Sequence, residues 1–152
     1  MGGERSEHRA GAAIGADAPT PTPDPSLPGR GERRTTASRQ AADSFGRRGE
    51  DAAAAWLERR GWTVLARRVK TKAGEVDLVA RREGLVAFVE VKVRKTAAAL
   101  DFAIDERRLA RVAAAAELLG ERFVGPGDDL RVDVLLLAPG VPPRHIENAW
   151  QP

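Results

Sequence analysis

The sequence contains no cysteine, no tyrosine and only two histidines, His8 and His145. Without cysteine there can be no disulfide framework, no cysteine zinc site and no cysteine nucleophile. Without tyrosine, covalent catalysis through a phenolic oxygen is excluded. All four serines precede residue 45, so the part that we expect to fold cannot build a Ser-His-Asp triad. Any chemistry must come from carboxylates, lysine and arginine, with or without a hard, oxygen-loving metal.

Long hydrophobic runs are also missing. No stretch approaches the roughly 20 apolar residues of a membrane span, and the N-terminus lacks the apolar segment of a secretory signal. We therefore expect a cytoplasmic protein with no membrane partner. The longest apolar run, residues 134–138, has the length of a buried strand. It fits either a central strand or part of a homodimer interface.

The composition changes near residue 45. The chain has 152 residues and a mass of 16.3 kDa, which predicts one domain. Residues 1–44 hold five prolines and six glycines, and their only large aliphatic residues are Met1, Ile14 and Leu27. Such a segment cannot bury enough apolar surface to offset the entropy of ordering. We predict a disordered leader over residues 1–44 and a folded domain over residues 45–152.

Positive charge is concentrated in the first half of this domain. Residues 45–100 carry 13 basic and 7 acidic residues, whereas residues 101–152 carry 6 basic and 9 acidic ones. A basic half indicates a polyanionic partner, most simply a nucleic acid. The alternative is a solvated arginine-rich surface without a partner.

Hydrophobic periodicity predicts an α/β fold with a mixed sheet. A first helix over 45–60 would be capped by Asp43 or Ser44 and stopped by Gly61. A second helix over 106–119 would be capped by Asp105 and ended by Gly120. The predicted strands cover residues 62–66, 75–80, 85–94, 130–137 and 144–149.

Two of these strands carry charged residues among valines. A two-residue turn at Glu83-Gly84 would pair the strands so that Asp77 lies opposite Glu90 and Glu75 opposite Lys92. Opposed Cβ atoms lie about 5 Å apart, so two carboxylates there either share a proton or recruit a cation. Their hard oxygens favour Mg²⁺ or Mn²⁺. The alternative is a solvated ladder of cross-strand ion pairs.

The first helix offers one more acid. Glu50 follows Gly49, and a glycine there permits close approach of the helix to the sheet. A functional role for Glu50 and an ordinary place at a helix N-terminus are equally consistent with this spacing.

At this point the motifs resemble a known family. Asp77, followed after twelve residues by Glu90-Val91-Lys92, resembles the Asp…Glu-x-Lys core of the PD-(D/E)xK nuclease superfamily. Within that superfamily, the blocks resemble the YraN-type uncharacterised family. The blocks are GRRGEDAAA over 46–54, GEVDLVA over 74–80, FVEVKVR over 88–94, RVDV over 131–134 and HIENAW over 145–150.

This resemblance implies a restriction-endonuclease-like mixed sheet flanked by helices, and an endonuclease that cleaves DNA. It implies metal ligation by Asp77 and Glu90, a further acid in Glu50, and activation of water or stabilisation of phosphate charge by Lys92. Arg108 stands where family members often carry lysine. A non-catalytic nucleic-acid-binding or repair-partner module, and a purely structural domain, remain as alternatives. The basic residues that we expect to contact nucleic acid are Arg67, Arg68, Lys70, Lys72, Arg94, Lys95 and Arg108.

Overall fold

The computed structural model describes residues 35–152. The prediction of a disordered leader falls mostly on residues 1–34, which lie outside the described residues. Over residues 35–152 the chain forms, in order, α1 Thr36–Arg59, β1 Thr63–Lys70, β2 Glu75–Arg82, β3 Leu85–Val93, the 3-10 helix η1 Ala98–Phe102, α2 Glu106–Phe123, β4 Asp129–Leu137 and β5 Arg144–Ile146.

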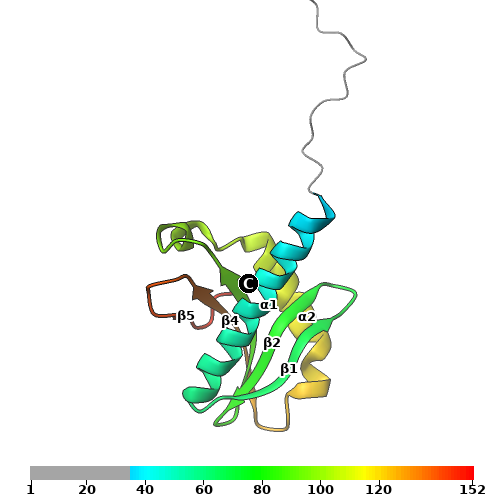
Figure 1. Cartoon of the computed structure of the whole chain (residues 1–152). Coiled ribbons are helices and arrows are strands. Elements are labelled where there is room, and N and C mark those ends of the chain that lie inside the picture. Colours follow the sequence, from blue (N-terminus) through cyan, green and yellow to red (C-terminus); the bar gives the residue numbers. More distant parts are fainter. Residues whose placement is uncertain (1–34) are drawn as a thin grey trace, which may run out of the picture. The chain divides into compact units, whose positions relative to one another are not determined.

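The five strands of this range form one mixed sheet in the order β1-β2-β3-β4-β5. β3 and β4 are parallel, and the other neighbours are antiparallel. α1 covers one face of the sheet and α2 covers the other (Figure 1). α2 is the crossover that joins the parallel pair, as parallel strands require. The predicted α/β class with a mixed sheet is confirmed.

The hairpin between β2 and β3 has the predicted turn. Glu83 and Gly84 both adopt positive φ angles, 48° and 77°, as a type I′ turn requires. Arg82 pairs with Leu85, and the register continues regularly to Leu78 opposite Val89. The turn therefore fixes which side chains of β2 and β3 meet.

The first helix begins nine residues earlier than predicted. Its N-cap is Thr35, whose side-chain oxygen accepts a hydrogen bond from the Ser38 backbone N–H at 3.3 Å. The predicted caps Asp43 and Ser44 lie inside α1, so the boundary placed at residue 44 is wrong for residues 36–44. These residues are almost wholly exposed, which is why they show no apolar stripe. The predicted stop is confirmed, because α1 ends just before Gly61, which has a φ of 84°.

The second helix begins as predicted and ends later. Asp105 caps it, accepting hydrogen bonds from the backbone N–H groups of Arg107 at 2.9 Å and Arg108 at 3.3 Å. Gly120 does not end α2, which continues to Phe123. The ring of Phe123 meets the buried ring of Phe88 edge to face at 6.4 Å, and this contact stabilises the extra turn.

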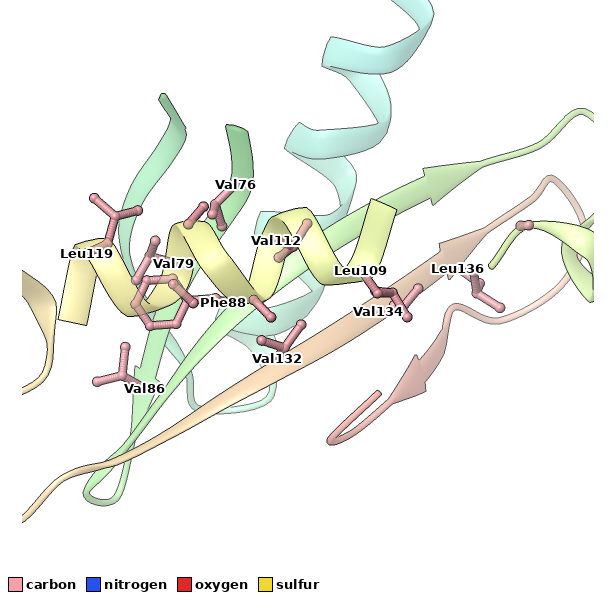
Figure 2. Packing of buried hydrophobic residues seen from close by; sticks show 14 of the residues in the cluster. Val76, Val79, Val86, Phe88, Leu109, Val112, Leu119, Val132, Val134 and Leu136 are labelled. Carbon is pink, nitrogen blue, oxygen red and sulfur yellow. The ribbon is translucent and has the colours of Figure 1, made fainter. Parts of the chain in front are cut away.

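Two apolar layers hold the helices to the sheet. On one face, α2 packs on Phe88 and on valines of β2, β3 and β4 (Figure 2). On the other face, α1 packs through Ala53, Trp56 and Leu57. β4 is a central strand whose residues 134–136 are buried within the protomer, so they do not form a dimer interface. Within residues 35–152 no helix is long and apolar enough to cross a membrane.

Candidate active site

Three carboxylates are buried in this otherwise apolar interior: Asp77, Glu90 and Asp133. Burying a carboxylate is costly unless it is paired, protonated or bound to a cation. Asp77 and Glu90 share one cavity of about 300 Å³, which α1, β2, β3 and α2 line together. Asp133 lies in the neighbouring strand β4 and has partners of its own.

Asp77 occupies the place where β2 and β3 separate. The backbone register ends at Leu78 opposite Val89, one residue before the predicted Asp77–Glu90 pair. Beyond that point β3 continues to pair with β4, and Oδ2 of Asp77 accepts a hydrogen bond from the Val91 backbone N–H at 2.7 Å. Oδ2 of Asp77 thus takes the place of the backbone carbonyl that would accept this hydrogen bond in a continuous pair of strands. The other oxygen, Oδ1, is left for contacts beside Glu90.

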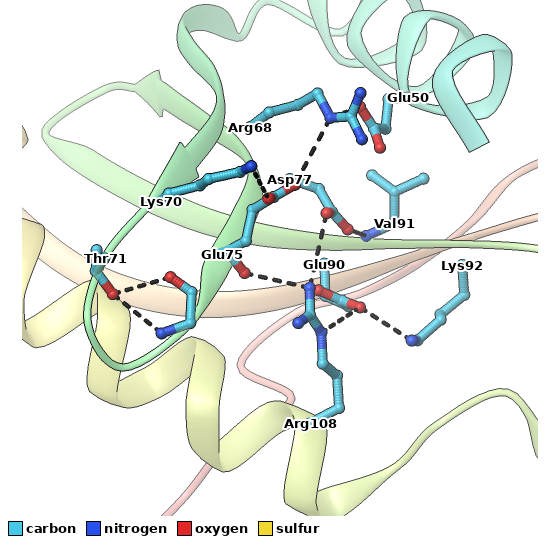
Figure 3. A network of polar contacts seen from close by, with 11 residues as sticks. Glu50, Arg68, Lys70, Thr71, Glu75, Asp77, Glu90, Val91, Lys92 and Arg108 are labelled. Atoms are coloured by element: carbon cyan, nitrogen blue, oxygen red, sulfur yellow. Dashed lines mark hydrogen bonds and ion pairs between the residues drawn. The ribbon is translucent and has the colours of Figure 1, made fainter. Parts of the chain in front are cut away.

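Glu90 is 2% exposed. Its Oε1 accepts a hydrogen bond from Arg108 Nε at 2.9 Å and forms an ion pair with Lys92 Nζ, also at 2.9 Å (Figure 3). Its Oε2 is buried and has no hydrogen-bond partner. Leaving a buried carboxylate oxygen without a partner costs free energy, so Oε2 is the atom of this cluster best placed to receive a ligand. The predicted shared face of Glu90 and Lys92 is confirmed by their contact.

Arg108 enters the cavity from the first turn of α2. Its guanidinium binds Glu90, donates to the Glu75 backbone carbonyl at 3.2 Å and lies 3.8 Å from Oδ1 of Asp77. The hydrogen bond to Glu90 raises the pKa of Arg108 above its ordinary value. The structure therefore places Arg108 inside the carboxylate cluster, whereas the sequence suggested a contact with nucleic acid.

The surroundings of Asp77 change its proton affinity. Burial, and next the Glu90 carboxylate, raise the pKa of Asp77 to about 7, although the Val91 N–H and Arg108 oppose the shift. Asp77 therefore titrates near neutrality. Carboxyl groups with a pKa shifted this far are concentrated at functional sites.

Glu50 lines the same cavity from α1. Gly49 places it there: a Cβ at Gly49 would overlap the Val93 side chain, so only glycine lets α1 approach β3 this closely. Burial raises the pKa of Glu50, and the guanidinium of Arg68, whose Nε lies 3.4 Å away, opposes that shift.

The predicted juxtaposition of Glu75 with Lys92 does not occur. Glu75 lies instead beside Arg68 at 3.6 Å and Lys70 at 3.9 Å. These contacts form a partly exposed ladder of ion pairs at the rim of the cavity, so the ladder that we considered as an alternative exists next to the buried pair and does not replace it.

A divalent cation fits the buried pair in part. Asp77 and Glu90 offer hard oxygens, one of them without a partner, and Mg²⁺ commonly binds through one or two carboxylates plus water and phosphate oxygens. No group of three or more acidic, histidine or cysteine side chains within residues 35–152 is arranged to hold a metal ion. Two ligands are thus available, Asp77 and Glu90. Glu50 lines the same cavity, and Arg108 supplies the positive charge beside the two carboxylates.

Comparison with known proteins identifies the family. Residues 49–137 match the model of the uncharacterised protein family UPF0102. A UPF0102 protein of Erythrobacter litoralis is 63% identical over 114 residues, which are 75% of this chain and 98% of the relative. A UPF0102 protein of Sphingopyxis alaskensis is 56% identical over 115 residues, 76% of this chain and 99% of the relative. The chain belongs to the UPF0102 family, the YraN family. The matched range contains the cavity residues from Glu50 to Arg108.

The other basic residues predicted to contact nucleic acid surround the cavity of this UPF0102 protein in different ways. Arg67 pairs with Asp51 at 2.7 Å on the surface, and Arg94 lines the cavity while donating to the Val93 carbonyl at 2.9 Å. Lys72 and Lys95 are exposed, in the β1–β2 turn and in the connector after β3. Arg68 and Lys70 belong to the ion-pair ladder at the rim.

Sequence reasoning missed the network around Asp133, which is fully buried. Its carboxylate accepts from Arg131 at 2.7 and 2.9 Å, from His145 Nε2 at 2.8 Å and from the Asn148 backbone N–H at 2.9 Å. Burial raises the pKa of Asp133, but these hydrogen bonds together outweigh burial and hold it below its ordinary value. The signal was a single aspartate inside an apolar strand. The network fastens β5 and the following segment to β4.

Proposed function

We propose that this protein is a metal-dependent phosphodiesterase that acts on DNA. The observation that carries the proposal is the single cavity in which Asp77, Glu90 and Lys92 meet, with one Glu90 oxygen left without a partner. Two hard carboxylates next to one lysine are suited to holding a cation and a phosphate together. The membership in UPF0102 adds no activity, because that family is uncharacterised.

In this mechanism Asp77 and Glu90 would hold the cation. When bound, Mg²⁺ or Mn²⁺ lowers the pKa of a coordinated water and neutralises phosphate charge. Lys92 is kept in position by its 2.9 Å contact with Glu90. Its ammonium group offers N–H donors to a phosphate oxygen or to the attacking water. Glu50, which lines the same cavity from α1, would accept a hydrogen bond from the attacking water.

Basic groups near the cavity supply backbone contacts. Arg94 lines the cavity and Lys95 follows it, while Lys72 lies in the turn beyond the ion-pair ladder. Contacts with phosphates position a nucleic acid without reading its bases. We therefore expect selection by DNA structure, such as a junction or flap, over selection by sequence.

The test is cleavage of branched, nicked and linear DNA with Mg²⁺ or Mn²⁺. Glu90→Gln removes a ligand and Lys92→Met removes the ammonium group. Glu117→Gln, on the exposed face of α2, is the matched control for loss of an acid away from the cavity. We expect the first two variants to lose about 10²- to 10⁴-fold in rate and the control to lose nothing. Equal cleavage by all four proteins would assign the activity to a contaminant and overturn the proposal.

A second candidate function is DNA binding without cleavage. The specific observation in its favour is Arg108, which already supplies positive charge to both carboxylates. Calorimetric titration with Mn²⁺, run beside a DNA-binding assay in chelator, separates the two functions. DNA binding together with no uptake of Mn²⁺ would select the non-catalytic module.

A further inference from the structure

A second pocket, lined mainly by basic residues, lies at the C-terminal end of α1. It has a volume of about 440 Å³ and is lined by Arg60, Gly61, Thr63, Arg81, Arg82 and Glu83. These residues come from the segment after α1, the start of β1, the end of β2 and the β2–β3 turn. Three of the six are arginines, and none of them was among the residues that the sequence suggested for nucleic-acid contact.

Two of these guanidinium groups are held in place by indole rings. Arg60 lies over the ring of Trp56 at 4.0 Å, and Arg82 lies over the ring of Trp62 at 4.6 Å. Arg82 also donates to the Arg60 backbone carbonyl at 3.3 Å. Stacking of this kind fixes the plane of a guanidinium and leaves its N–H edge available.

The third arginine is already neutralised. Arg81 binds both oxygens of Asp128, at 2.6 and 2.8 Å. Within residues 35–152, by contrast, Arg60 and Arg82 form no ion pair with an acid, and Glu83 is the only acid that lines the pocket. The pocket thus keeps an excess of positive charge on the two stacked guanidinium groups, and the Thr63 hydroxyl adds a further hydrogen-bond donor.

We propose that this pocket binds a phosphate group of a nucleic-acid backbone, held between Arg60 and Arg82. Paired guanidinium forks match the tetrahedral oxygens of phosphate. Arg60, the C-cap of α1, lies ten residues after Glu50, which corresponds to about 15 Å along a helix axis. Arg82 stands five residues after Asp77 on β2, about 17 Å along a strand. A strand of B-form DNA covers that distance in about five base pairs.

The inference rests on the proposed function only in taking nucleic acid as the source of phosphate. The pocket is separate from the carboxylate cavity, so the two can fail independently. Binding in the pocket requires no metal and no cleavage. The test is therefore run in chelator on the Glu90→Gln protein, with inorganic phosphate, tripolyphosphate and duplexes of 4 and 12 base pairs as probes.

The variants are Arg60→Gln and Arg82→Lys. Arg60 is exposed at the helix end, so its loss should spare the fold, and Arg82→Lys keeps the charge while removing the fork. The matched control is Arg122→Gln, because Arg122 also lies over an aromatic ring, Phe123, at 4.8 Å. The readouts are fluorescence anisotropy of labelled duplex and amide chemical shifts at Gly61 and Thr63.

We expect Arg60→Gln to weaken binding of the 12-base-pair duplex about tenfold. The slope of log affinity against log salt should fall by about one phosphate contact, while binding by the Arg122→Gln control is unaffected. Shifts at Gly61 and Thr63 with duplex but not with tripolyphosphate support a nucleic-acid source. Shifts with tripolyphosphate or phosphate at equal or lower concentration than duplex overturn it in favour of a small anion. Unchanged duplex binding in Arg60→Gln and Arg82→Lys overturns the pocket itself, even if the wild-type protein cleaves DNA.

Discussion

The buried Asp77 carboxyl should make this protein less stable as the pH rises toward neutrality. Its pKa is about 7 in the folded protein against an ordinary value of 3.8. The folded state therefore binds the proton more tightly than the unfolded state does. The stability that this proton contributes is complete below pH 3.8 and is lost as the pH rises through about 7.

The size of the effect follows from the two pKa values. A difference of about 3 pH units, at about 1.36 kcal/mol per unit, gives a loss of about 4 kcal/mol between pH 4 and pH 8. Asp77→Asn removes the titration, and its amide oxygen can still accept the hydrogen bond from the Val91 N–H. The variant should therefore gain stability relative to the wild type as the pH rises, by up to that amount.

The assay is urea unfolding followed by tryptophan fluorescence between pH 4.5 and pH 8, in chelator. Asp133→Asn is the contrasting variant, because the pKa of Asp133 is held below its ordinary value and its stabilisation is lost as the pH falls. That variant should be less stable at pH 7 by about 3 kcal/mol, the usual cost of breaking a buried ion pair. A difference between Asp77→Asn and wild type that stays constant from pH 4.5 to pH 8 would refute the dominance of burial at Asp77.

Two further predictions concern the packing and charge of the cavity. Gly49→Ala should lower the free energy of unfolding by about 1–3 kcal/mol, because its Cβ overlaps Val93; Val93→Ala should restore part of the loss in a double-mutant cycle, and full additivity would contradict the contact. Arg108→Gln should destabilise the metal-free protein, because Glu90 loses a positively charged partner. It should tighten Mn²⁺ binding about tenfold in calorimetry, because that positive charge no longer competes with the ion for Glu90. Weaker Mn²⁺ binding would show that Arg108 supports the site instead.

The parts of the molecule that local rules govern were predictable from the sequence. The Glu83-Gly84 turn fixed the β2–β3 register because a two-residue loop leaves one way to pair the strands. Asp105 is a cap by its own side-chain chemistry. The start of α1 was not predictable from an apolar stripe, because residues 36–44 bury almost nothing and are helical by propensity alone.

The charged side chains depended on contacts between distant residues. Arg108 is 18 residues from Glu90, and only the angle at which α2 crosses the sheet brings its guanidinium into the cavity. His145 and Asp133 are 12 residues apart and meet only because β5 pairs with β4. The sequence therefore indicated the pairing of Asp77 with Glu90 and the position of Lys92 beside Glu90, but it indicated neither the contacts of Arg108 nor the network around Asp133.

The exposed beginning of α1 has a consequence for access to the carboxylates. Ala42, Phe45 and Gly46 form part of the cavity wall, yet the turns that precede them contribute little buried surface. Unwinding of a helix end that buries so little requires far less free energy than global unfolding. Fraying that reached Ala42 would remove part of the cavity wall, so we expect ligand entry to respond to changes in helix propensity at residues 36–44 that leave the melting temperature unchanged.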